Sequence, residues 1–167
     1  AVGKKGGIAN FTAEYLNKEK TLRPGFDFRK GFGEAAIQGL NLFGNLVLPI
    51  SDKTEFYAFG GRNFRDTDAY AFTRNDGAKV VESVYPGGYT PRITSEIVDN
   101  SIAAGIRTKY ESGWKMDLSN TFGKNLFHYN IKNTINASLL AASPREFDAG
   151  GHSLSQNTTN LDFSKNY

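Results

Sequence analysis

Residues 101–123 alternate between apolar and polar side chains for more than twenty positions, with one interruption. Ile102 and Ile106 fall on one parity, while Arg107 and Lys109 fall on the other. The alternation resumes after the interruption. A period of two is typical of a β-strand with one apolar face and one polar face. Two strands joined by a tight turn are therefore predicted here.

The same period recurs along the chain, and the composition agrees with it. Glycine, phenylalanine and tyrosine number 18, 13 and 8, which favours pleated sheet with tight bends over helix packing. Aromatic residues fall on both parities of the third predicted strand, so its faces are not assigned. The predicted fold is an all-β, antiparallel up-and-down meander with six strands at 7–17, 39–50, 54–66, 97–110, 114–129 and 155–166.

The connections between these strands alternate in length. Two are short, at 51–53 and 111–113, whereas 18–38, 67–96 and 130–154 are long. One rim of tight turns and one rim of long loops is the layout of an outer-membrane β-barrel, and about 9–11 residues of tilted strand cross a bilayer. The pattern favours a barrel whose outer face meets lipid. A soluble sandwich has the same alternation and is the alternative.

Bulk properties exclude several other classes. The 20 basic and 17 acidic residues are dispersed and leave a formal charge of +3, which argues against a nucleic-acid partner. Cysteine is absent, so disulfides and cysteine-ligated metals are excluded. The longest apolar run, at 46–50, is too short for a transmembrane helix, and the first residues lack the apolar core of a signal peptide.

Histidines, acidic pairs and glycine pairs give no catalytic or metal signal. His128 and His152 have no partner at metal-ligand spacing, and His152, Ser153 and Asp148 sit too close along one loop to favour a hydrolase triad. The pairs in "DTD" (66–68) and "EFD" (146–148) supply too few ligands for calcium, so solvated turn acids are favoured. The glycine pairs match no phosphate-binding loop. We predict no enzyme activity, cofactor or metal.

Several segments in order resemble the barrel of TonB-dependent outer-membrane receptors. The likeness covers roughly residues 40–167. It is carried by "LPISDKTEFYAFGGRNFRD" (48–66), "YPGGYTP" (85–91), "GWKMDLSNTFGKN" (113–125), "NTINASL" (133–139), "SPREFDAGG" (143–151) and "NLDFS" (160–164). The resemblance implies part of the early wall of a large transmembrane β-barrel with 22 strands and a plugged lumen.

The same resemblance implies a location, an activity and partners. Such receptors sit in the cell outer membrane and import a metal chelate, vitamin, oligosaccharide or peptide. Energy reaches them through TonB, which engages a region ahead of the plug, and this chain contains neither that region nor the plug. The implied partners are outer-membrane lipid, the plug and other barrel strands, TonB, and a surface lipoprotein or other subunits of a membrane complex.

Three groups of side chains are assigned roles on this basis. The lipid-facing set is Phe11, Ile102, Ile106, Trp114, Met116 and Leu118. The lumen-facing set is Glu14, Arg107, Lys109, Lys115, Asp117 and Lys124. Aromatic residues of the long loops are the candidates for ligand contact, namely Tyr70, Phe72, Tyr85, Tyr89 and Phe147. The alternative for these aromatics is that they pack the loops on one another, which is the favoured reading.

Overall fold

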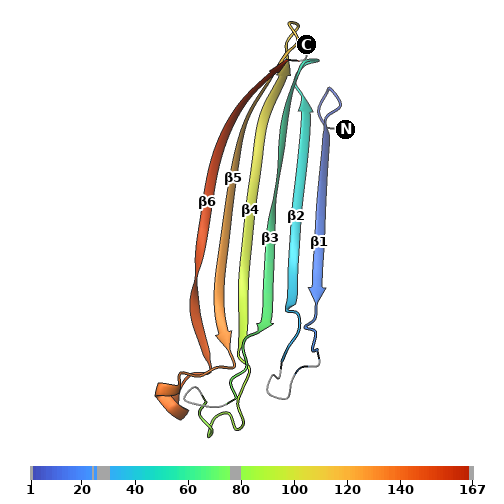
Figure 1. Cartoon of the computed structure of the whole chain (residues 1–167). Coiled ribbons are helices and arrows are strands. Elements are labelled where there is room, and N and C mark those ends of the chain that lie inside the picture. The colour runs from blue at the N-terminus through green and yellow to red at the C-terminus, as the bar shows by residue number, and fades with distance from the viewer. Residues whose placement is uncertain (1, 24, 26–30, 76–79, 166–167) are drawn as a thin grey trace.

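The computed structural model describes residues 2–23, 25, 31–75 and 80–165. Six strands form a single antiparallel sheet in which each strand pairs with the next along the chain (Figure 1). They are β1 (Ile8–Lys18), β2 (Ala36–Pro49), β3 (Thr54–Tyr70), β4 (Arg92–Lys109), β5 (Trp114–Lys132) and β6 (Glu146–Lys165). The predicted all-β meander is confirmed. The sheet is open, with β1 and β6 at its two edges.

Short and long connections lie at opposite ends of the sheet (Figure 1). The turn at 110–113 closes through the Tyr110 amide, which donates to the Trp114 carbonyl at 2.8 Å, and Gly113 takes a φ of +83°. Residues 19–35, 71–91 and 133–145 connect the strands at the other end, the last of them containing the short 3-10 helix η2 (Ala137–Ala142). In the part of the chain that the structure describes, no helix has the length and apolar character needed to cross a membrane.

All six strands extend further toward the long connections than the sequence predicts: β1 ends at Lys18 rather than at 17, β2 begins at Ala36 rather than at 39, β5 ends at Lys132 rather than at 129, and β3, β4 and β6 differ most. β3 runs to Tyr70 rather than to 66, β4 begins at Arg92 rather than at 97, and β6 begins at Glu146 rather than at 155. Acidic and glycine-rich residues in these stretches are typical of loops. They are accommodated because a neighbouring strand satisfies their backbone groups, as in the pairing of Tyr70 with Arg92. Position 166, at the predicted end of the last strand, lies outside the described residues.

A β-bulge explains how β6 passes through its glycine pair. The register with β5 shifts between Tyr129 and Asn130, and Gly150 adopts a φ of +75°. The Gly150 amide donates to the Asp148 carboxylate at 2.7 Å, which holds the extra residue in place. Glycine is needed at this point because an L side chain strains a backbone with positive φ. Phe147, predicted to lie in a loop, is therefore a strand residue paired with Ile131.

The register assigns every strand residue to one of two faces, because partners across an antiparallel pair point the same way. We call them the Trp114 face and the Lys115 face, after adjacent residues at the start of β5. The Trp114 face holds the even positions of β2 to β5, and the odd positions of β1 and most of β6. The third strand, unassigned from sequence, places Phe56 and Phe64 on the Trp114 face and Tyr57 and Phe59 on the other.

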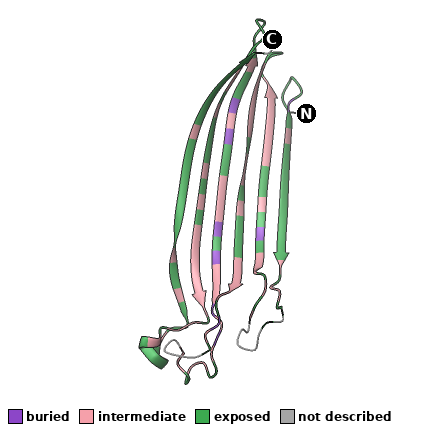
Figure 2. Cartoon of the chain, viewed as in Figure 1, coloured by how far each residue is buried: buried purple, intermediate pink, exposed green. Residues whose placement is uncertain are grey.

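The sheet is one layer with little interior, as Figure 2 shows by the scarcity of buried positions. Only Tyr89, Ile97 and Ala103 are buried hydrophobic residues among those the structure describes. Large apolar side chains are instead open on the Trp114 face, where Phe11 is 87% exposed and Ile102 is 58% exposed. No second sheet covers either face within the described chain. The two packed sheets that the sandwich alternative requires are thus not formed by these residues.

A glycine in β4 generates a testable consequence of this register. Tyr57 of β3 is paired with Gly105, and its ring crosses that glycine so that its hydroxyl donates to Asp117 of β5 at 2.8 Å. A Cβ at position 105 would lie 2.5 Å from the Tyr57 ring, whereas a Cβ at Gly123 of β5 would meet nothing closer than 4.0 Å.

We expect Gly105→Ala to lower the free energy of unfolding by about 1–3 kcal/mol, because the Tyr57 ring must move and give up its hydrogen bond. Gly123→Ala is the matched control and should change that free energy by less than about 0.5 kcal/mol. Urea unfolding of the two variants measures the difference. Equal losses in both variants would contradict the crossing of Tyr57 over Gly105.

Candidate functional site

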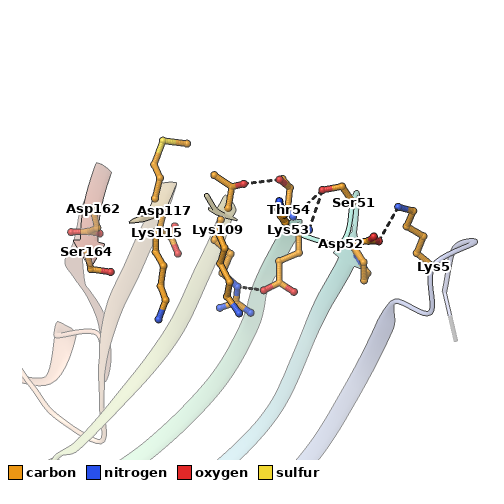
Figure 3. Close-up of a pocket in the computed structure, with 15 residues that line it drawn as sticks. Lys5, Ser51, Asp52, Lys53, Thr54, Lys109, Lys115, Asp117, Asp162 and Ser164 are labelled. Carbon is orange, nitrogen blue, oxygen red and sulfur yellow. Dashed lines mark hydrogen bonds and ion pairs between the residues drawn. The ribbon is translucent and has the colours of Figure 1, made fainter. Parts of the chain in front are cut away.

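The Lys115 face forms a charged hollow of about 770 Å³ at the short-turn end (Figure 3). Arg107 contacts Glu55 of β3 through its Nε, and its guanidinium lies 5.2 Å from the centre of the Tyr57 ring. Lys109 and Lys115 are direct register partners. Two like charges in direct opposition repel. Asp117 and Asp162 are register partners in the same hollow, so like charges of both signs lie opposite each other there.

A polar ladder crosses the same face at mid-height. Its members Glu14, Asn41, Asn63, Asp99 and Asn125 occupy one register row on five adjacent strands. Asn125 donates to Asp99 at 2.6 Å, Asn41 donates to Glu14 at 3.4 Å, and Asn63 donates to Asn41. The Asn63 side-chain oxygen is buried and has no hydrogen-bond partner among the residues that the structure describes. A surface of aligned amides and carboxylates suits contact with water or with another polar surface.

An aromatic cluster occupies the Lys115 face near the long connections. Phe127 and Tyr129 of β5 have ring centres 4.3 Å apart, and His152 of β6 stacks on Phe127 at 5.5 Å with an interplanar angle of 11°. Buried Ile97 of β4 is the register partner of Phe127. Such a group of flat rings can stack on a planar or ring-shaped ligand. This cluster is not among the predicted site residues, although the odd parity of Phe127 and Tyr129 places both with Lys115.

Tyr85 and Tyr89, two of the predicted ligand contacts, pack on each other within the 71–91 connection. Tyr85 and Tyr89 stack with ring centres 4.5 Å apart, and only 9% of Tyr89 is exposed. Arg145, from the last long connection, lies 5.4 Å over the Tyr85 ring. Burial raises the pKa of the Tyr85 hydroxyl above its ordinary value, and Arg145 opposes that rise. This pair favours the packing alternative over open ligand contact.

The other three aromatic candidates have different surroundings. Phe72 is 64% exposed beside Arg74, whose guanidinium lies 5.6 Å from its ring. Tyr70 is the last residue of β3, with the Lys20 ammonium 5.1 Å from its ring. Phe147 lies within β6 on the Lys115 face, next in that face to the aromatic cluster. Of the predicted set, Phe72 is the most open to solvent.

An ion-pair centre ties together three elements at the long-loop end. Asp68 of β3 accepts from Arg92 Nε of β4 at 2.9 Å, and Lys20, just beyond β1, lies 2.8 Å from the same carboxylate. The Asp68 side chain is only 19% exposed. Burial lowers the pKa of the Lys20 ammonium, and the nearby Arg92 lowers it further. The carboxylate therefore holds two cations together that would otherwise repel.

Two of the predicted sets keep to one face each, with a single correction. All six predicted lipid-facing residues lie on the Trp114 face, and Glu14, Arg107, Lys109, Lys115 and Asp117 all lie on the opposite face. Lys124 does not lie with them. It is ten residues from Trp114 along an unbroken strand, so it shares the Trp114 face. The prediction followed its charge instead of its parity and was wrong.

The two histidines lie on opposite faces. His128 is on the Trp114 face, where its Nε2 is 2.9 Å from the Asp148 carboxylate, while His152 belongs to the aromatic cluster. Within the described residues, no group of three or more histidine, aspartate or glutamate side chains is placed to hold a metal ion. These side chains thus act in ion pairs and ring contacts.

Comparison with known proteins supplies no relative for this chain. No protein-family model, curated protein or solved structure matches it. What the chain does is therefore inferred from the two faces of its own sheet.

The Asp68 centre gives a prediction for the long-loop end. Asp68→Asn should lower the free energy of unfolding by about 1–3 kcal/mol, because it leaves Lys20 and Arg92 close together without their shared carboxylate. It should also speed proteolysis within 71–91. Asp66→Asn is the matched control, since Asp66 lies on the same strand and face, is exposed, and makes no ion pair with any described residue. Identical behaviour of the two variants would refute the role given to Asp68.

Proposed function

We propose that this chain forms part of the wall of a transmembrane β-barrel, within a TonB-dependent outer-membrane receptor that binds and imports a nutrient. The observation that carries the proposal is an exposed apolar band on the Trp114 face, which spans all six strands in their short-turn half. Its exposed members include Phe11, Leu42, Ile102, Ile106, Trp114, Leu118, Phe122 and Phe163, and Phe56 of β3 is half-buried among them. A band of this kind is what lipid contact requires.

The length of the strands supports the same assignment. β5 has 19 residues, and at about 3.3 Å per residue and a tilt of 35–45° it would rise about 45–50 Å. The apolar band of such barrels is only about 25 Å tall. The strands should therefore project beyond the bilayer on one side. The Trp114 face does become polar toward the long connections, where it carries Asp66, Glu96, His128 and Lys132.

The Lys115 face would then line the lumen. Its charged hollow and polar ladder suit the surface of a plug, which the ion pairs and amides can contact. The aromatic cluster lies nearer the long connections, where an incoming nutrient arrives first. Stacked rings suit an oligosaccharide, a vitamin or another ligand with a flat face, with a metal chelate or peptide as the other classes. In this proposal the exposed Phe72 and His152 and the half-buried Tyr129 are the ligand contacts.

The edges of the sheet indicate what completes the barrel. β1 and β6 each present one unpaired side within the described chain. Unpaired edges invite further strands, and a membrane barrel has none. The remaining strands and the plug would belong to the same receptor, and TonB would act through the region ahead of the plug. Transport is thus a property of the whole assembly, and this chain contributes a binding wall without an enzymatic step.

Trp114, the single tryptophan of the chain, tests the proposal directly. The protein containing this chain is reconstituted in bilayers with brominated lipid, which quenches tryptophan fluorescence at short range. Brominated lipid should quench the fluorescence of Trp114, because 42% of this residue is exposed and it lies on the apolar face. The quenched signal should therefore be absent from the Trp114→Phe variant.

The matched control moves the ring to the other face. Lys115→Trp in the Trp114→Phe background places a tryptophan one residue along and pointing into the hollow, where brominated lipid should leave it unquenched. Failure to quench Trp114, or equal quenching at both positions, would overturn the membrane-wall proposal. A protein that stays monodisperse without detergent would then favour a soluble all-β structural or adhesive module.

A further inference from the structure

Two cations lie on the apolar band of the Trp114 face. Arg62 of β3 is the register partner of Asn100 of β4, and Asn100 is the partner of Lys124 of β5. The three side chains thus form one row across adjacent strands. Arg62 and Lys124 are exposed, and Asn100 is half-buried. Adjacent strands are about 4.8 Å apart, so the two long cationic side chains can converge on a single group over Asn100.

The surroundings of this row give the cations no negative partner. One register row toward the short turns holds Gly60, Ile102 and Phe122, and one row toward the long connections holds Phe64, Val98 and Leu126. Neither Arg62 nor Lys124 forms an ion pair with any residue that the structure describes.

The contacts that the row does make leave its charge uncompensated. The Arg62 guanidinium lies 4.4 Å over the Phe64 ring. The nearest acids on this face, Asp66 and Glu96, stand four residues further along their strands, about 13 Å away. A cation on a lipid-facing surface is costly unless it reaches an anion or water. An anion from outside the sheet is therefore expected here.

The height of the row indicates which anion. Lys124 is ten residues from Trp114 on the same strand, a distance of about 33 Å along it. A tilt of 35–45° makes that about 25 Å along the membrane normal, which is the height of the apolar band in such barrels. The row therefore lies near the band's upper boundary, with one further apolar row, Phe64, Val98 and Leu126, on its long-loop side. Lipid phosphates lie at that level.

We propose that Arg62, Asn100 and Lys124 form a binding site for the phosphate headgroup of a membrane lipid, whose acyl chains lie over Ile102 and Phe122. This inference rests on the proposed function, because it takes the Trp114 face as the lipid surface. The Arg62 guanidinium presents paired N–H donors to phosphate oxygens, Lys124 supplies a second positive charge, and the Asn100 amide can donate between them. By binding the headgroup, Arg62 and Lys124 would also hold the barrel at a fixed depth in the bilayer.

Native mass spectrometry of the detergent-solubilised protein that contains this chain tests the site. Short-chain phosphatidic acid is titrated as the probe, because its phosphate monoester is unshielded. Arg62→Gln combined with Lys124→Gln should weaken its binding roughly tenfold or more, as expected when two charge-assisted contacts are lost. Lys109→Gln combined with Lys115→Gln removes the same charge from the opposite face and should leave binding unchanged.

Each other result counts against the site. Unchanged binding in the Arg62/Lys124 variant, or equal loss in both double variants, overturns it. Displacement of the lipid by equimolar inorganic phosphate would show a free-phosphate site and overturn the lipid assignment. The brominated-lipid measurement on Trp114 separates the two levels of inference. If Trp114 is quenched but phosphatidic acid binding is unchanged in the Arg62/Lys124 variant, only the lipid site is refuted. If Trp114 is not quenched, the membrane-wall proposal is refuted as well.

Discussion

The hydrogen-bond register between neighbouring strands, shifted only at the bulge between β5 and β6, is the constraint on which the rest of this structure depends. Because side chains alternate along each strand, a slip of one residue would move an entire strand's apolar set to the other face. In β4 and β5 the register holds from Arg92 and Lys132 down to the turn at 110–113. Few residues are buried. Fidelity of pairing, rather than a packed core, therefore keeps each side chain on its own face of the sheet.

Each face changes character along its length, and the two changes run in opposite directions. The Trp114 face is apolar near the short turns and polar near the long connections. The Lys115 face begins with Arg107 and Lys109 and ends with Phe127 and Tyr129. A sheet with one apolar face and one solvated face would need only one alternation of apolar and polar side chains along each strand. Two patterns in sequence along the same strand fit a wall that passes from one environment to another.

The alternation made the fold predictable from the sequence, and it located the two short turns. Trp114, Met116 and Leu118 could be placed on one face because their parity and their chemistry agree. For Lys124 the two disagree: its charge indicates the polar face, whereas its even position places it on the Trp114 face. The start of β6 was missed because Gly150 and Asp148 signal a loop locally, and only the partner strand β5 turns that signal into a bulge. The cluster of Phe127, Tyr129 and His152 depends on this same pairing, so a single strand's sequence does not reveal it.

The strands lengthen steadily from β1, with 11 residues, to β6, with 20. The two edges of the sheet are consequently unequal as templates for growth. A long bare edge offers more backbone groups to an arriving strand and is also the greater hazard for unwanted aggregation. In the barrel proposed above, a further strand would find more backbone partners at β6 than at β1. The gradient in strand length would thus favour growth of the proposed barrel wall from one edge.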